Sequence, residues 1–364
     1  MEPMSPRRAG PGLAVLLAFV VLAAACASDD DTAQPTEPTG AAPSSTMAPT
    51  TRPGTTTTVA PEGAAACGTG TAALPAGESS GSLMHDGVER TYERSVPASY
   101  DGTTPAPVLL NFHGFGGTGA AQNAASGLVA PAGERGYVVV APDGGPLTVV
   151  AGVEGADQAA AQGFDGIPFW NIFGSGDVSF GADTGIGAEA TQVGYDDIGF
   201  VTALLDELEA TLCVDTDRIY AAGHSNGAGM SSALGCEIGS RLAAIGPVAG
   251  VNLTGACPGD GPVPVLSLHG DADEAASYEG NNLLGFELGN PSVPDRMAQW
   301  ATLNGCDPTP TTDEDRPGVV RTVWSGCDAD TELWTITEGS HAWPGGDPVD
   351  ANVVLLDFFD AHIR

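Results

Sequence analysis

Short apolar runs recur along residues 107–337, and Gly or Pro stands beside most of them. The runs cover residues 107–112, 136–142, 218–222, 242–248, 264–268 and 332–337. Strands that are apolar along their whole length are typical of a parallel sheet whose two faces are both covered by helices. The pattern therefore predicts six strands of one such sheet.

The residues between these runs show the spacing of helices. Residues 197–212 place apolar side chains three or four positions apart, and residues 228–236, 293–303 and 351–363 look similar. Alternating strands and helices predict one α/β domain, with a mostly parallel central sheet and helices on both faces. Residues 151–191 are rich in Gly and lack periodicity, so we expect a long surface excursion there, near the functional site.

The first 66 residues differ from the rest of the chain. Arg7 and Arg8 precede an apolar run at residues 13–25, which is shorter than the roughly 20 residues that span a membrane. Residues 1–26 are therefore typical of an export signal. Cys26 follows small residues as in a bacterial lipoprotein signal, which predicts a lipid anchor on the outer face of the cell membrane; plain secretion is the alternative. Residues 27–66 are rich in Thr, Pro and Ala, which predicts a disordered linker before a folded domain at residues 67–364.

The charge of the chain excludes several partners and chemistries. The formal net charge is −34, and all 12 basic residues are Arg. Such a surface repels nucleic acid, so we expect no nucleic-acid partner, and membrane contact only through the lipid anchor. A chain without Lys cannot form a Schiff base, a P-loop or a Ser-Lys dyad.

Six cysteines remain when Cys26 is set aside, and an even number in an exported protein predicts three disulfides. They are Cys67, Cys213, Cys236, Cys257, Cys306 and Cys327. Six cysteines allow 15 connectivities. The local pairs 236–257 and 306–327 flank plausible loops, which leaves the pair 67–213. There is no Cys-x-x-Cys pair, so we predict no metal site.

The sequence Gly-His-Ser-Asn-Gly at residues 223–227 follows a predicted strand and precedes a predicted helix. This is the context of a nucleophile elbow, in which a tight turn exposes a reactive serine. Ser225 is therefore the predicted nucleophile. The same pattern recurs at residues 77–81, where it precedes the first apolar run, and there we expect a flexible loop.

A serine needs a base to take its proton, and in this fold the acid and then the histidine follow it along the chain. His341 comes after the last apolar run and is the preferred base. The acid should follow the run at 264–268. We prefer Asp273; Asp271 is the alternative, with Glu274 also possible.

Acyl transfer also needs donors for the developing oxyanion. The backbone N–H groups of Asn226 and Phe115 are the predicted pair, and Gly114 is an alternative to Phe115. Trp170 and Trp343 line the substrate pocket in one interpretation and belong to the core in the other. This chemistry requires neither a metal nor an organic cofactor.

Several motifs together resemble the polyhydroxybutyrate depolymerase-like and feruloyl esterase-like secreted serine esterases. They lie at residues 170–171, 196–201, 214–220, 223–230, 269–273, 278–280 and 339–345. The resemblance covers residues 67–364 and implies an α/β-hydrolase catalytic domain. It also implies Ser225 as nucleophile, Asp273 as acid and His341 as base, with Phe115 and Asn226 as oxyanion donors.

The function predicted from these residues is that of an exported, monomeric serine carboxylic-ester hydrolase. The resemblance implies a polyester like polyhydroxybutyrate, or feruloyl and acetyl esters of polysaccharides, as its ester substrate. One alternative keeps the same triad in a cell-envelope acyltransferase or a peptidase. Another is a non-catalytic envelope-binding protein, against which the intact Ser, Asp and His argue.

Overall fold

The computed structural model describes residues 67, 74–149, 166–172, 178–180, 190–192, 195–254, 257, 259–281 and 289–364. The predicted export signal at 1–26 with Cys26, and the predicted linker at 27–66, lie outside these residues. No helix in the described ranges is both long and apolar enough to cross a membrane.

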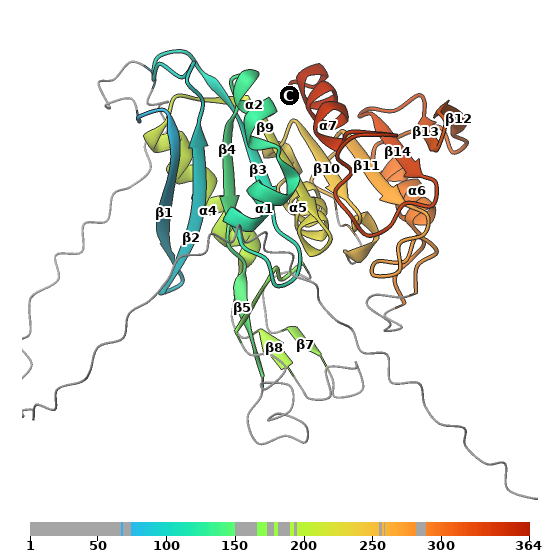
Figure 1. The fold of residues 1–364 in the computed structure, drawn as a ribbon, viewed down its shortest axis with the longest axis horizontal. Helices are drawn as coiled ribbons and strands as arrows, with labels where there is room; N and C mark the ends of the chain where they lie inside the picture. Colours follow the sequence, from blue (N-terminus) through green and yellow to red (C-terminus); the bar gives the residue numbers. More distant parts are fainter. Residues whose placement is uncertain are drawn as a thin grey trace, which may run out of the picture. The chain divides into compact units, whose positions relative to one another are not determined.

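Ten strands form the central sheet (Figure 1). They are β1 (Gly77–His85), β2 (Val88–Val96), β3 (Ala106–Phe112), β4 (Val138–Pro142), β9 (Val214–His224), β10 (Ala244–Val248), β11 (Val265–Gly270), β12 (Thr311–Arg316), β13 (Val319–Trp324) and β14 (Thr331–Ile336). Their spatial order is β1-β2-β4-β3-β9-β10-β11-β14-β13-β12. The strands from β4 to β14 in this order run parallel, and antiparallel pairs flank them at both edges. The parallel strands are those that the six apolar runs predict, so the predicted sheet is confirmed.

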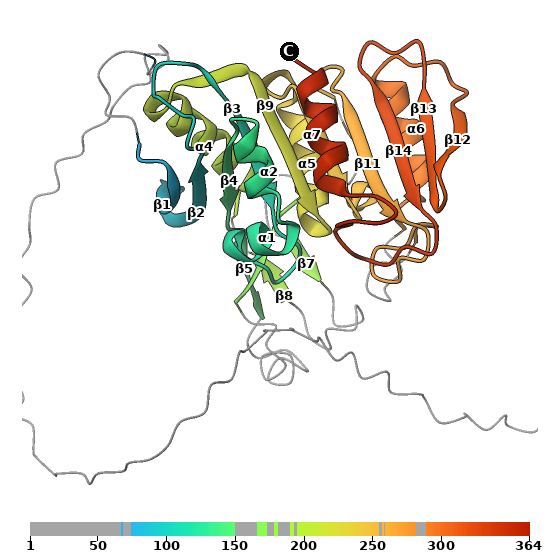
Figure 2. The same cartoon turned by 45° about the horizontal axis from the view of Figure 1, so that its top comes forward.

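Helices cover both faces of this sheet, as predicted (Figure 2). They are α1 (Gly119–Ser126), α2 (Val129–Glu134), α4 (Asp197–Thr211), α5 (Asn226–Glu237), α6 (Val293–Leu303) and α7 (Ala351–Ala361), with short 3-10 turns at Gly239–Arg241 and Val251–Leu253. Val108 and Leu110 of β3 pack in the core with residues of α4, α5 and α6, whereas Leu109 packs in the core that contains residues of α2 and α7. The two-residue period of a strand thus supplies two apolar cores from one apolar run.

Helix α4 shows how local sequence places a helix on the sheet. Asp196 caps its first turn, because its carboxylate accepts the Gly199 N–H at 2.8 Å. Phe200, Leu204 and Leu208 recur with helical spacing and are buried. Burial of one such side chain stabilises the fold by about 1.5–3 kcal/mol, so this apolar stripe holds α4 in place more than its intrinsic helix propensity does.

A second, small sheet follows β4 along the chain. It joins β6 (Ile167–Phe169), β5 (Gly145–Val149), β8 (Ala190–Gln192) and β7 (Val178–Phe180) in that order (Figure 1). Most of the predicted excursion at 151–191 lies outside the described residues. One described part of it corrects the prediction: Phe169, Trp170 and Ile172 are buried, so this part packs into the domain and is not surface.

One prediction about the start of the domain was wrong. Residues 77–81, expected as a flexible loop, lie in β1, which ends at His85. Strand β1 pairs with β2 along its whole length, from Gly77 opposite Val96 to His85 opposite Val88. Its residues are mostly exposed, so its backbone ladder forms without the apolar pattern that a sequence prediction requires.

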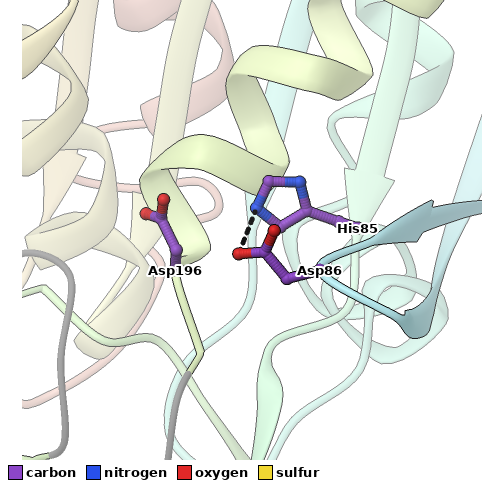
Figure 3. A group of neighbouring side chains, drawn as sticks. All are labelled: His85, Asp86 and Asp196. Atoms are coloured by element: carbon purple, nitrogen blue, oxygen red, sulfur yellow. Dashed lines mark ion pairs between the residues drawn. The ribbon is translucent and has the colours of Figure 1, made fainter.

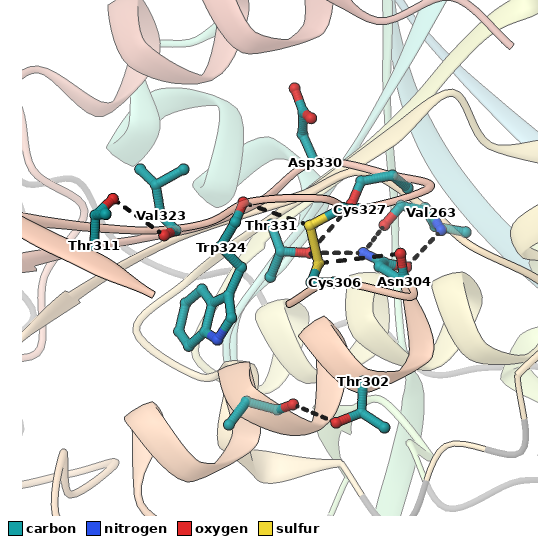
Figure 4. Close-up of a disulfide and its surroundings, with 12 residues drawn as sticks. Val263, Thr302, Asn304, Cys306, Thr311, Val323, Trp324, Cys327, Asp330 and Thr331 are labelled. Carbon is teal, nitrogen blue, oxygen red and sulfur yellow. Dashed lines mark hydrogen bonds between the residues drawn. A yellow bond between two sulfur atoms is a disulfide. The ribbon is translucent and has the colours of Figure 1, made fainter. Parts of the chain in front are cut away.

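The three predicted disulfides, Cys67–Cys213, Cys236–Cys257 and Cys306–Cys327, are confirmed. The last of these lies beside the buried Asn304 (Figure 4). The Asn304 amide donates to the Val263 carbonyl at 2.8 Å and to the Thr331 hydroxyl at 2.9 Å. The C-terminal end of α6 is thereby fixed to β14 and to the segment that enters β11.

Candidate active site

Ser225 lies at the junction between β9 and α5. Its backbone has φ 58° and ψ −120°, a strained conformation for a residue with a side chain and the one expected of a nucleophile elbow. Two hydrogen bonds hold it there: the Ser225 N–H donates to the Val248 carbonyl at 2.9 Å, and the Gly229 N–H donates to the Ser225 carbonyl at 3.0 Å.

Glycine is required on both sides of this serine because the backbone folds tightly on itself. A Cβ atom on Gly223 would overlap the Gly227 carbonyl, and a Cβ atom on Gly227 would overlap the Phe112 carbonyl of β3. No other residue fits either position without a shift of the backbone. The Gly-x-Ser-x-Gly pattern at 223–227 therefore has a steric cause in the backbone of the turn. In the repeat at 77–81, Gly77 has open space where its Cβ would be, and a Cβ atom on Gly81 would meet the Tyr92 side chain instead of backbone.

Asp273 and His341 meet at one edge of the sheet. They follow β11 and β14, which are parallel neighbours, so both loops emerge at the same end. The His341 Nδ1 lies 2.7 Å from the Asp273 Oδ2. Because a carboxylate only accepts, the proton is on Nδ1, and Nε2 keeps a free lone pair. The ring of His224, the neighbour of Ser225, lies 4.8 Å from that of His341, which places the imidazole beside the elbow.

The Asp273 carboxylate is buried and accepts several hydrogen bonds. Its Oδ1 accepts the N–H groups of Ala275 at 2.9 Å and Ala276 at 2.8 Å. The His269 Nε2 lies 3.2 Å from Oδ2 and 2.9 Å from the Ala276 carbonyl. Burial by itself would raise the pKa of Asp273, but the hydrogen bonds from His269, His341 and Ala276 together hold it well below its usual range. The carboxylate is therefore ionised at neutral pH.

The alternative acid, Asp271, has a different environment. Its side chain is exposed, and its Oδ1 accepts the Glu338 N–H at 2.6 Å. It thus joins the loop after β11 to the loop after β14, but it does not pair with His341. Glu274 is also exposed. Of the three candidates, the geometry pairs only Asp273 with a histidine among the described residues.

The loop after β3 presents a backbone N–H next to Ser225. The Gly114 carbonyl accepts from the His113 Nδ1 at 2.7 Å and from the Gly117 N–H at 3.0 Å. In a trans peptide the following N–H points the opposite way, so the Phe115 N–H is directed away from these two donors. A Cβ atom on Gly114 would lie 3.3 Å from the Ser225 Cβ, which shows how closely this loop approaches the serine.

His113 fixes that loop, a role that the sequence analysis missed. Its Nε2 accepts the Gly144 N–H at 2.9 Å, which leaves the proton on Nδ1 for the Gly114 carbonyl. Burial lowers the pKa of His113, so the neutral ring persists. The available signal was a histidine at the end of a buried apolar run, a position where an imidazole must find backbone partners.

Asn226 begins α5, so its backbone N–H has no partner within the helix. Within the described part of the chain, neither this N–H nor that of Phe115 has a hydrogen-bond acceptor. The Asn226 side chain is occupied elsewhere: its Oδ1 accepts the Trp170 N–H at 2.7 Å and its Nδ2 donates to the Trp170 carbonyl at 3.1 Å. Two free N–H groups thus border Ser225, from the residues that the sequence predicts.

Comparison with known proteins identifies the family. Feruloyl esterase C of Emericella nidulans is 30% identical over 207 residues, which cover 53% of this chain and 71% of that protein. The chain belongs to the feruloyl esterase family. Feruloyl esterase B of Piromyces equi is 29% identical over 258 residues, 68% of this chain, and the chain spans 41% of that relative's length. The predicted feruloyl esterase resemblance is confirmed, and the family is one of carboxylic ester hydrolases.

Two further comparisons concern a relative that matches this family member along almost its whole length, and a solved structure with a similar fold. A Nocardia uniformis subsp. tsuyamanensis protein named as an esterase, NocK, is 28% identical over 363 residues, 93% of this chain and 90% of the relative. No family model matches the chain. Among solved structures, the acetyl xylan esterase from Aspergillus awamori superposes with a TM-score of 0.51 at 12% identity, covering 78% of this chain and 99% of that one. The predicted α/β-hydrolase fold is confirmed.

Trp170 and Trp343, the two tryptophans predicted to line a substrate pocket in this chain, have different environments. Trp170 has no exposed surface, and its Nε1 donates to the His113 carbonyl at 3.0 Å. It is a core residue, which corrects its interpretation as a pocket wall. Trp343 is half-buried, lies two residues after His341 and donates from Nε1 to the Asn352 side chain at 2.9 Å. Of the pair, Trp343 is the one that keeps exposed surface.

His224 keeps the site from holding a second positive charge. Burial, with the nearby His341 as a smaller cause, lowers the pKa of His224 to about 3. Its ring is therefore neutral when the imidazole of His341 takes up a proton. The arrangement offers one titratable base, one fixed carboxylate and two free N–H donors around a strained serine.

Proposed function

We propose that this chain is an exported serine carboxylic-ester hydrolase that works through an acyl-enzyme. The observation that carries the proposal is the Asp273–His341 pair, with Nδ1 and Oδ2 at 2.7 Å, beside the strained turn of Ser225. A serine hydroxyl is a weak nucleophile unless a neighbouring base takes its proton, and the free Nε2 of His341 is that base.

In the first step the Ser225 Oγ attacks the ester carbonyl carbon while the His341 Nε2 takes its proton. The negative charge on the former carbonyl oxygen is stabilised by the N–H groups of Phe115 and Asn226, which need no reorganisation because they are already free. Asp273 stabilises the charged imidazole by its fixed carboxylate. The carbon–oxygen ester bond breaks, and the alcohol leaves with the proton from Nε2.

In the second step water takes the place of the alcohol. His341 accepts a proton from the water as its oxygen attacks the acyl carbon, and the same two N–H groups stabilise the new oxyanion. The bond to Ser225 Oγ breaks, the serine recovers its proton from the imidazole, and the acid leaves. The cycle returns the protein to its starting state.

For the substrate we propose feruloyl esters of polysaccharides, because the relatives at 29–30% identity are feruloyl esterases. The half-buried Trp343 is the aromatic side chain placed to pack against a feruloyl ring. Export is supported by the three disulfides, which persist in oxidising compartments. Lipidation at Cys26 and a monomeric state remain parts of the proposal.

Labelling with a fluorophosphonate probe tests the nucleophile. We expect the wild-type chain to label and Ser225→Ala to lose both labelling and ester turnover. Ser79→Ala is the matched control, because it changes the central serine of the other Gly-x-Ser-x-Gly sequence and should label like the wild type. Ester turnover by Ser225→Ala at the wild-type rate would exclude the proposed mechanism.

An ester panel tests the substrate separately from the chemistry. The panel compares methyl ferulate and feruloylated arabinoxylan with p-nitrophenyl acetate, acetylated xylan and a short-chain polyhydroxyalkanoate. We expect the highest kcat/KM on the feruloyl esters. A preference for acetyl esters or for the polyester would keep the serine mechanism and overturn the proposed substrate.

A further inference from the structure

Although the sequence predicts no metal site, we propose that His85, Asp86 and Asp196 form a binding site for a divalent cation of the Zn²⁺ class, which joins the β1–β2 hairpin to the start of α4. The site lies apart from Ser225, His341 and Asp273 in the sequence and shares no residue with them. Figure 3 shows the His85 imidazole facing the Asp86 carboxylate, with Asp196 on the neighbouring segment that leads into α4.

The three donor atoms are close enough to share one ion. One ligand atom from each residue lies within 4.8 Å of the other two, and the His85 Nε2 is 3.7 Å from the Asp86 Oδ2. Zinc binds nitrogen and oxygen at about 2.0–2.2 Å, so tetrahedral ligands lie about 3.4 Å apart. The donor atoms would have to move inward to reach this spacing, and the exposed Asp86 side chain is the one most free to do so.

The His85 Nε2 atom is buried and has no hydrogen bond among the described residues. The Asp86 carboxylate, at 3.7 Å, is beyond hydrogen-bond distance. A buried polar atom without a partner is costly, and such atoms often indicate a missing water or ion. The Asp196 cap of α4 uses Oδ1 for the Gly199 N–H, so Oδ2 can serve as a ligand without loss of the cap.

Glycine at position 199 keeps the space between the two donors open. A Cβ atom on Gly199 would overlap the Asp196 carboxylate and lie 3.1 Å from the His85 Nε2. Glycine within a helix costs stability relative to alanine. Alanine at this position would fill the gap in which an ion between Asp196 and His85 has to sit.

The donor set indicates the kind of ion. One imidazole and two carboxylates suit Zn²⁺ and similar transition metals, whereas Ca²⁺ and Mg²⁺ take oxygen ligands. The net charge of −34 also draws cations to the surface. The ion would stabilise the fold, because it would join β1 to Asp196 at the start of α4. The next residue, Asp197, is itself held in place: its carboxylate pairs with Arg90 at 2.5 Å and accepts the Asn171 N–H at 2.7 Å.

Zinc titration of the full chain tests this site. After treatment with EDTA and dialysis, ZnCl₂ is added in a calorimeter, and thermal unfolding is followed in parallel. We expect one ion per chain and a rise in Tm of about 5 °C at 100 times the Kd. His85→Gln should weaken binding by more than about 100-fold, because loss of an outer-shell partner alone costs about 10–100-fold. Asp196→Asn should also weaken it, while the asparagine still caps α4.

Two controls separate this site from other histidines. His362→Gln removes a histidine that pairs with a single carboxylate, Asp330, at 3.1 Å, and should bind Zn²⁺ like the wild type. His341→Ala should also keep the high-affinity site. Equal Zn²⁺ affinity in His85→Gln and the wild type, or loss of binding in His341→Ala alone, overturns the proposal. Co²⁺ absorption gives a second measure: an intense tetrahedral or five-coordinate visible spectrum that His85→Gln lacks supports the site.

Discussion

The Asp273 carboxylate shows how a single residue is set up by its neighbours. The backbone N–H groups of Ala275 and Ala276 donate to Oδ1 and fix it, while two histidines approach Oδ2. Asp271, two residues earlier, caps a turn instead. Two aspartates at nearby positions thus have different roles, so a comparison of variants at the two positions tests which of them is the catalytic acid.

We predict that Asp273→Asn lowers kcat by about 10⁴-fold, because an amide cannot hold the imidazole in the tautomer that leaves Nε2 free. Asp271→Asn should change kcat by less than about threefold, the usual range for an exposed residue. Steady-state turnover of p-nitrophenyl acetate by the two purified variants provides the comparison. Similar losses in both, or a larger loss in Asp271→Asn, would contradict the assignment of the acid.

His224 predicts a dependence of stability on pH. In the unfolded chain it takes up a proton below its ordinary pKa of 6.5, but in the folded chain it stays neutral down to about pH 3. The unfolded state therefore binds more protons between pH 6.5 and 3. Stability present above pH 6.5 is lost as the pH falls through this window, by about 1.4 kcal/mol per pH unit.

Urea unfolding at pH 7 and pH 5 measures this contribution. Over that interval the wild type should lose about 2 kcal/mol more than His224→Gln, which has no titrating group at this position. All other titrating residues are common to both proteins, so the difference isolates His224. An equal loss in the two proteins would mean that the folded His224 accepts protons as freely as the unfolded one.

For single residues, the sequence allowed the reactive side chains to be predicted but not the side chains that position them. Ser225, Asp273 and His341 could be proposed because motif and chain order limit their positions. The contact of His113 with Gly144 depends on how two distant loops meet, and that of His269 with Asp273 depends on the path of the turn after β11. Such contacts leave no periodic mark on the sequence.

Among the elements, strands that are buried on both faces could be predicted and strands that are exposed could not. Strand β3 is buried at all of its positions, whereas all six residues of β12 are exposed. The polar β12 has a structural benefit: a charged outer strand discourages pairing with another sheet edge. A sequence that protects an edge in this way loses the apolar alternation by which a strand is recognised.

The turn between β9 and α5 is also joined to a distant segment by the side chain of Asn226. We predict that Asn226→Ala lowers the free energy of unfolding by about 2–4 kcal/mol, because the buried N–H and carbonyl of Trp170 lose their partners. Its kcat should fall as well, although the backbone N–H remains, since the elbow is less firmly held.

Asn304→Ala is a matched control for that variant. Asn304 is a buried asparagine whose amide donates to Val263 and Thr331, and its loss should destabilise the fold to a similar extent while kcat is retained. Urea unfolding and turnover are measured on both variants. Equal kcat for Asn226→Ala and Asn304→Ala would show that the Trp170 contact contributes to stability alone.

For the whole molecule, the length of chain that each disulfide closes sets its contribution. Cys67–Cys213 closes 146 residues and Cys306–Cys327 closes 21. Loop-closure entropy gives about 5 kcal/mol for the first and about 3 kcal/mol for the second. We predict that the double alanine variant at 67 and 213 loses more stability than the one at 306 and 327. Guanidinium unfolding under non-reducing conditions measures the free energy of unfolding of both variants. A larger loss in the variant at 306 and 327 would refute the entropic explanation.

The α/β fold could be foreseen because apolar runs and helical patterns recur from residue 107 onward. The small sheet formed by β5 to β8 could not, because its strands are short, and three of them, β6, β7 and β8, span only three residues each. Three residues are too few for a period to appear. The boundaries at 26 and 66 stay predictions, since they lie outside the described residues.

The Cys67–Cys213 disulfide also decides where a mechanical load enters the domain. Cys213 directly precedes β9, which lies between β3 and β10 inside the sheet. A pull transmitted through the residues before Cys67 therefore reaches an inner strand through a covalent bond, and the hairpin that begins at Gly77 stays outside the loaded path. An edge strand pulled from its end unzips one hydrogen bond at a time, whereas an inner strand must shear against two neighbours. For a chain held by its N-terminal end in moving fluid, the cross-link would transfer drag to an inner strand of the sheet and not to its edge.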